Sequence, residues 1–218
     1  SLDGTPVDGT HPAHIHENNA AVGGGDIIYT FTSVDGTSGM SQSNVAALDN
    51  GTDFGYADVL EADAYINVHL SAEEIETLVA QGDIGKNELT GEEKSYTLGE
   101  KGGSGVSGSV LFEERVNGEA LATISLDGTP VDGTHPAHIH ENSVSETGGI
   151  LYTFTPVDGE TGVSQSNVAA LDPPQGEDIG AEFGYTDVLG VDGYINVHLS
   201  AQELTTIVAQ GNIGANAN

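Results

Sequence analysis

The chain has 218 residues and a formal net charge of −30 at pH 7, because 34 Asp and Glu residues stand against only four Lys and Arg residues. Such a surface repels polyanions, which excludes nucleic acid and anionic membranes as partners. The sequence contains no Cys, which excludes a disulfide scaffold, and no apolar run approaches the ~20 residues of a membrane-spanning helix, so we expect no membrane insertion.

In chain order, the first elements that the pattern predicts are short strands. Apolar and polar residues alternate in AHIH (13–16), IIYTFT (27–32) and YINVHL (65–70), and a period of two is typical of strands. Between the last two segments, Ser41–Leu48 is compatible with a short helix or an irregular connection.

A helix is predicted over Leu70–Gly82. Ser71 is an expected N-cap, Glu74 completes a capping box three residues later, and Gly82 ends the segment. Three apolar residues at helical spacing form its stripe: Ile75, Leu78 and Val79. The same pattern recurs over Ser200–Gly211, so we expect one short helix in each half of the chain.

Further strands are expected after residue 88. KSYTL (94–98), SGSVLFEERV (107–116) and EALATISL (119–126) all fit strands, and Asn117-Gly118 between the last two is a strong hairpin turn signal. Many short strands with turn signals predict a mainly β protein, a β-sandwich of Greek-key type.

The chain is an internal duplication. Ser1–Asn18 recurs without change as Ser125–Asn142, and Gly85 matches Gly214, so the period lies between 124 and 129 residues. Two further pairs of segments match closely: Ile27–Asp49 with Ile150–Asp172, and Phe54–Gly85 with Phe183–Gly214. We therefore predict two tandem domains, residues 1–87 and 88–218.

The two predicted domains are unequal, because residues 88–124 have no counterpart ahead of Ser1. One interpretation is that the chain is a fragment of a longer tandem array. The other is that a neighbouring copy of the chain supplies the missing strands, as in a donor-strand polymer.

Histidine is used in one pattern only. Each copy has an H-x-x-H-x-H motif and a distant N-x-H motif, which together contain every His of the chain: His11, His14, His16 and His69, then His135, His138, His140 and His198. On a strand, residues two apart share a face, so the rings can converge if the two strands are neighbours. Glu17 and Asn18 are candidate acceptors that would fix a ring tautomer.

Clustered imidazoles predict a transition-metal site in each copy, with copper or zinc as the ion, since imidazole nitrogen suits both metals. The competing interpretation is a set of sheet-face histidines satisfied by hydrogen bonds. Calcium is a weaker prediction, because the Asp-Gly turns lack the spacing of a calcium loop. Those turns begin at Asp3, Asp8, Asp35, Asp127, Asp132 and Asp158.

These residues resemble the CHRD (chordin-type) domain. The resemblance rests on ELTGEE (88–93), SGSVLFEERVNG (107–118), HPAHIH (135–140) and GYINVHLS (193–200), and it covers 88–218 fully and 1–87 in part. It implies an extracellular or cell-surface location and a fold similar to the copper/zinc superoxide dismutase sandwich.

By that similarity, the ligands would be His14, His16 and His69 in one copy and His138, His140 and His198 in the other, with His11 and His135 less firmly implied. The chain departs from such enzymes, because it has no Asp-containing second zinc subsite and no Arg near either cluster. An acidic surface would also repel superoxide.

Three functions follow from these observations. The first is a non-catalytic structural or adhesive tandem-repeat protein, a component of a cell surface or filament, with a metal ion in each repeat. The second is a copper- or zinc-scavenging protein. The third is a superoxide-dismutase-like metalloenzyme.

Overall fold

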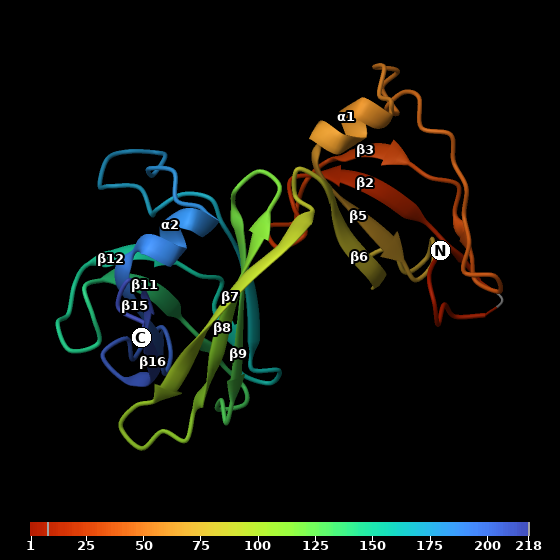
Figure 1. The fold of residues 1–218 in the computed structure, drawn as a ribbon. Helices are drawn as coiled ribbons and strands as arrows, with labels where there is room; N and C mark the ends of the chain where they lie inside the picture. The colour runs from red at the N-terminus through yellow and green to blue at the C-terminus, as the bar shows by residue number, and fades with distance from the viewer. Residues whose placement is uncertain (8, 218) are drawn as a thin grey trace. The chain divides into compact units, whose positions relative to one another are not determined.

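A computed structural model describes residues 1–7 and 9–217. The chain divides into two compact units, Ser1–Glu88 (unit 1) and Leu89–Asn218 (unit 2). Both consist mainly of antiparallel strands, with one short helix each (Figure 1). The prediction of a mainly β protein is confirmed. Within the described part of the chain, neither helix is long and apolar enough to cross a membrane.

Unit 2 contains one curled, eight-stranded sheet in the order β12-β11-β15-β16-β7-β8-β9-β14. Its strands are β7 (Leu89–Glu100), β8 (Ser107–Arg115), β9 (Ala120–Asp127), β11 (Ala137–Glu141), β12 (Ile150–Thr153), β14 (Val163–Val168), β15 (Asp192–His198) and β16 (Ile207–Gly214). A separate pair, β10 (Thr134–His135) and β13 (Val157–Asp158), and the helix α2 (Tyr185–Gly190) complete it.

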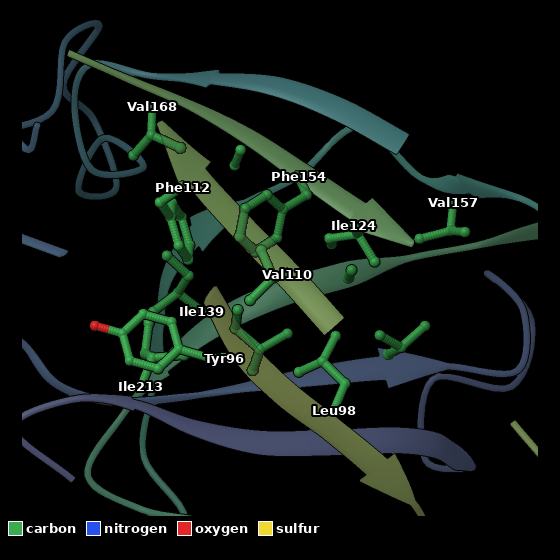
Figure 2. Packing of buried hydrophobic residues seen from close by; sticks show 14 of the residues in the cluster. Tyr96, Leu98, Val110, Phe112, Ile124, Ile139, Phe154, Val157, Val168 and Ile213 are labelled. Atoms are coloured by element: carbon green, nitrogen blue, oxygen red, sulfur yellow. The ribbon is translucent and has the colours of Figure 1, made fainter. Parts of the chain in front are cut away.

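The core of unit 2 lies between the two halves of this sheet (Figure 2). Leu98 on β7, Phe112 on β8 and Ile124 on β9 face Ile139 on β11 and Ile213 on β16, and all five are fully buried. The strand alternation seen in the sequence causes this, since every second side chain of a strand points to the same face. The segment β7–β9 thus covers the half-sheet β12-β11-β15-β16.

Unit 1 contains the half-sheet alone. Its four strands run in the order β3-β2-β5-β6, the same order as β12-β11-β15-β16 in unit 2. They are β2 (Ala13–Glu17), β3 (Ile27–Thr30), β5 (Asp63–His69) and β6 (Leu78–Gly85), accompanied by the pair β1 (Thr10–His11) and β4 (Val34–Asp35) and the helix α1 (Tyr56–Glu61).

The helix predicted over Leu70–Gly82 is wrong, and so is its counterpart over Ser200–Gly211. The expected cap forms, because the Ser71 hydroxyl accepts the N–H of Glu74 at 3.1 Å. After this single turn, however, residues 78–85 pair with β5 as β6, and β16 pairs with β15 in the same way. A ladder of backbone hydrogen bonds outweighs the weak helical preference of the segment.

The helix of each unit lies earlier in the chain than predicted. α1 starts at Tyr56, where the Asp58 carboxylate accepts the N–H of Gly55 at 2.8 Å, and α2 repeats this contact between Gly184 and Asp187 at 2.9 Å. Each helix has only six residues, too few to show a helical apolar period. Ser41–Leu48 forms neither a helix nor a strand, so the irregular alternative is the one observed.

Candidate metal centre

Three histidines of unit 1 converge on one face of the half-sheet. His14 and His16 lie on β2, and His69 ends the neighbouring strand β5. In the register of the two strands, His14 lies opposite Asn67 and His16 opposite Tyr65, so all five side chains share a face. The predicted convergence of the two separated motifs is therefore observed.

The imidazoles are close enough to share one ion. The ring centroids of His14 and His69 lie 5.1 Å apart, those of His14 and His16 6.0 Å, and those of His16 and His69 6.5 Å. One nitrogen from each ring lies within 4.8 Å of the others. Three nitrogens at about 2.0–2.1 Å from a common ion are separated by roughly 3.0–3.5 Å, so small side-chain rotations would close the site.

Unit 2 repeats this geometry. His138 and His140 on β11 meet His198 at the end of β15, with centroid separations of 5.8 Å, 5.0 Å and 6.4 Å for the pairs 138/140, 138/198 and 140/198. The two copies thus differ in their loops but bring three histidines together in the same arrangement.

Backbone carbonyls select which nitrogen each ring presents in unit 1. The Nδ1–H of His16 donates to Gly25 O at 3.0 Å, and the Nδ1–H of His69 donates to Ile75 O. Their Nε2 atoms are therefore left with free lone pairs, and both are buried without a hydrogen-bond partner among the described residues, as is Nδ1 of His14. A buried nitrogen without a partner is costly, and a metal ion would satisfy all three.

The same pattern holds in unit 2. The Nδ1–H of His140 donates to Gly148 O at 3.2 Å, which leaves its Nε2 buried and unpartnered within the described residues. Nδ1 of His138 and Nε2 of His198 are buried without partners there as well, while the backbone of Leu204 hydrogen-bonds the His198 ring. The predicted tautomer-fixing role thus belongs to loop carbonyls and not to Glu17 or Asn18, and residue types alone could not show it.

Stacked tyrosines limit ring movement at both sites. The His16 ring lies on Tyr65 at 5.1 Å with an interplanar angle of 21°, and His140 lies on Tyr194 at 5.1 Å and 20°. The sequence signal for these partners was the Y-x-N-x-H spacing, because Tyr65 shares the face of His69 four residues later.

Burial favours the neutral form of four triad imidazoles, those of His14, His138, His140 and His198. It lowers the pKa of His138 from 6.5 to about 4, and the neighbouring rings of His198 and His140 lower it further by charge repulsion. Burial is also the main cause of the lowered pKa of His14, His140 and His198. Neutral imidazole is the form that binds a metal, so protons compete weakly for these sites at neutral pH.

The fourth predicted ligand of each site lies elsewhere. The Nδ1 atom of His11 is 2.8 Å from Leu70 O and its Nε2 atom is 3.2 Å from Pro6 O, and neither His11 nor His135 belongs to a triad. His135 makes the same two contacts, with Leu199 O and Pro130 O. The structure thus gives three convergent histidines per unit, and His11 and His135 join loops.

In the Asp-Gly turns of Asp35 and Asp158, the carboxylate accepts hydrogen bonds from its own turn and does not join a cluster of metal ligands. Asp35 accepts the N–H and hydroxyl of Ser38 at 2.8 Å and 2.7 Å, which lowers the pKa of its carboxyl, and Asp158 does the same with Thr161. Within residues 1–7 and 9–217, the groups with metal-ligand spacing are the two His triads. Asp8 lies outside the described residues.

A hollow of about 370 Å³ lies over the triad of unit 1, lined by the three histidines together with residues such as Tyr65, Asn67 and Glu76. An ion held by the triad would keep an open position on this side, which an external ligand could occupy. No family model matches the chain, and no curated protein matches it either.

Proposed function

We propose that this chain is a tandem-repeat structural or adhesive protein of an extracellular surface or filament, in which each unit is stabilised by a copper or zinc ion. The observation that carries the proposal is the triad itself, present in both units with metal-ligand spacing and with buried ring nitrogens that have no hydrogen-bond partner among the described residues. A set of imidazoles satisfied by hydrogen bonds would not leave these atoms without partners.

Copper and zinc are proposed because the donors of each triad are three imidazoles. Hard ions such as calcium and magnesium prefer oxygen ligands, whereas imidazole suits zinc and copper. The ligand set contains no thiolate and no thioether, which makes a Cu(I)-thiolate site unsuitable.

A structural role is preferred over a redox enzyme on electrostatic grounds. Residues 1–85 contain no Lys or Arg, so the first site lies in a stretch that carries only negative side-chain charge besides its histidines. Anionic substrates such as superoxide would be repelled from it. The CHRD resemblance and a Greek-key sandwich similar to superoxide dismutase are part of the same proposal, supported by the H-x-H pair on one strand and the distant His on its neighbour.

Metal removal tests the stabilising role. An ion that binds only the folded state adds about 2.7 kcal/mol of stability at a hundredfold excess over its dissociation constant. We expect EDTA to lower the melting temperature of metal-loaded protein, and re-addition of copper or zinc to restore it. An unchanged melting curve, with elemental analysis showing no metal before chelation, would contradict the proposal.

A scavenging protein is the second candidate, and the hollow over the first triad favours it. A structural ion is usually enclosed by protein ligands, whereas an open position suits capture and exchange. Competition with chromogenic chelators separates the two roles. Capture requires an affinity far tighter than folding needs, together with rapid ion exchange between chains.

A further inference from the structure

The half-sheet of unit 1 has an apolar face on the side opposite the triad. Ala13, Phe31, Ile66 and Val68 line a hollow of about 730 Å³ on this side, together with Leu2, Val34 and a run of polar loop residues. We call this surface the open face. It is formed entirely by residues of unit 1.

Unit 2 shows what lies on the equivalent surface. The counterparts of Phe31, Ile66 and Val68 are Phe154, Ile195 and Val197, each at most 2% exposed beneath the segment β7–β9. Figure 2 shows the packing around Phe154, which lies beside Phe112 with the two ring centroids 6.4 Å apart. The residues around the open face are nearly the same as in unit 2. In unit 2 the segment β7–β9 packs on their counterparts, whereas the described residues of unit 1 form no such segment.

The difference in exposure is seen beside the hollow, because the lining residues Ala13, Val34 and Val68 are themselves at most 7% exposed. Tyr56 is 78% exposed, whereas its counterpart Tyr185 is 6% exposed. In unit 2, the N–H of that tyrosine donates to Gly118 O, in the hairpin turn between β8 and β9, at 2.9 Å. On the edge strand, Val79 is 36% exposed and its counterpart Val208 is 3% exposed.

Glycines give an independent indication. A Cβ at Gly211 would lie 2.0 Å from Thr97 O on β7, so the close approach of β7 to β16 requires glycine there. The matched residue of unit 1 is Gly82, where a Cβ would meet nothing within 4 Å. Gly82 therefore leaves room for a strand to pack on β6 as β7 packs on β16.

We propose that the open face is a docking surface for a three-stranded β segment of the Leu89–Asp127 type. The docking strand pairs with the free edge of β6, and its hairpin covers Tyr56. The partner carries apolar residues on alternate positions of one face, as Leu98, Phe112 and Ile124 do. A second copy of this chain is not the occupant, because its β7–β9 segment is already packed in its own unit 2.

The test uses the full chain and a synthetic polypeptide of residues 89–127 as the probe. Hydrogen–deuterium exchange of β6 and α1 is followed while the probe is added. We expect saturable binding of one probe per chain, with slowed exchange of the β6 amides. The half-sheet of unit 2 gains no protection, because it is already covered.

A matched pair of variants identifies the surface. Gly82→Val adds a side chain where the free chain has open space, so folding is retained, but the added Cβ meets the docking strand. We expect this variant to weaken probe binding by about tenfold or more, as a clash of this kind costs on the order of 1–3 kcal/mol. Gly133→Val is the control, because it also adds a side chain in open space but belongs to unit 2 and not to the unit that forms the open face.

A fused chain provides a second test in case the separate probe does not fold. A copy of residues 89–124 is joined ahead of Ser1, which repeats the natural junction with Ser125. If β6 and Tyr56 stay unprotected in this chain too, the docking surface is refuted. If only the fused chain becomes protected while a folded probe does not bind, docking of a separate segment is refuted. If the β6 amides are already protected in the unmodified chain because the chain self-associates, a second copy is the occupant and the proposed occupant is refuted.

Discussion

A nine-residue segment has the same sequence in both units but a different structure in each. SQSNVAALD occurs as residues 41–49 and again as residues 164–172. In unit 2, its first five residues belong to β14 and pair with β9, whereas in unit 1 the same five residues form no strand. A strand thus forms here because a partner strand is present, and the local sequence only permits it.

The metal centres of the two units differ far less than their cores. Both triads lie on the sheet face opposite the apolar face, and both are oriented by carbonyls from loops of their own unit. The cover of the apolar face therefore has little influence on them. Each half-sheet therefore forms its own triad, whereas a full core also requires the additional segment β7–β9.

The largest predicted effect concerns that additional segment. Phe112→Ala removes a fully buried ring that has no counterpart in unit 1, and should destabilise unit 2 by about 3–5 kcal/mol. Unit 1 should keep its stability. Hydrogen–deuterium exchange resolved by peptide measures both units in one sample, and equal losses in the two would contradict the comparison.

Loss of one imidazole should affect one site only. We expect His16→Ala to abolish binding at unit 1 and His140→Ala to abolish it at unit 2, each weakening its own site by more than about 100-fold, because even residues that only orient a ligand contribute 10- to 100-fold. Isothermal titration with copper or zinc should then give one ion per chain for either variant. Loss of both ions from a single substitution would show that the sites are not independent.

The matched glycines should respond differently to alanine. Gly211→Ala forces a Cβ against Thr97 O and should destabilise unit 2 by about 1–3 kcal/mol. Gly82→Ala fills open space in a strand and should be neutral or stabilising by about 0.4–1 kcal/mol. Denaturant unfolding of the two variants beside the parent chain checks the difference. A similar loss in both would mean that β6 is covered in the free chain.

A further predicted effect is the pH dependence of the metal-free protein. The folded-state pKa of His138 is about 4 against an ordinary value of 6.5, so the unfolded chain binds more protons between these values. Stability should therefore fall as the pH falls from 6.5 towards 4. Unit 2 should lose stability in this range, because burial lowers the pKa of His138, His140 and His198. Urea midpoints of both units at several pH values measure this, and rising stability on acidification would contradict it.

Much of the site could be predicted from the sequence, because it depends on strand alternation. The i, i+2 spacing of His14 and His16 and the N-x-H motif ending at His69 placed three rings on one face once the strands were neighbours. His11 could not be assigned in this way. Its surroundings are carbonyls of Pro6 and Leu70, which come together only through the folded loops.

The fold was predictable to the level of class, and the exceptions have a common cause. The Ser71 capping interaction was predicted correctly as local chemistry, but the residues after it join a sheet through contacts with β5. Ser41–Leu48 and β14 show the same dependence on a distant partner. Patterns within a short window predict strands well only where the partner strand is also present.

The most direct test of the account is the number of ions that the chain holds. Protein loaded with copper or zinc and then dialysed against metal-free buffer is analysed by plasma mass spectrometry, beside a variant in which His14, His16, His138 and His140 are replaced by Ala. The account predicts two ions per chain for the parent and none for the variant. A parent chain that retains no ion, or a variant that retains as many, would contradict it.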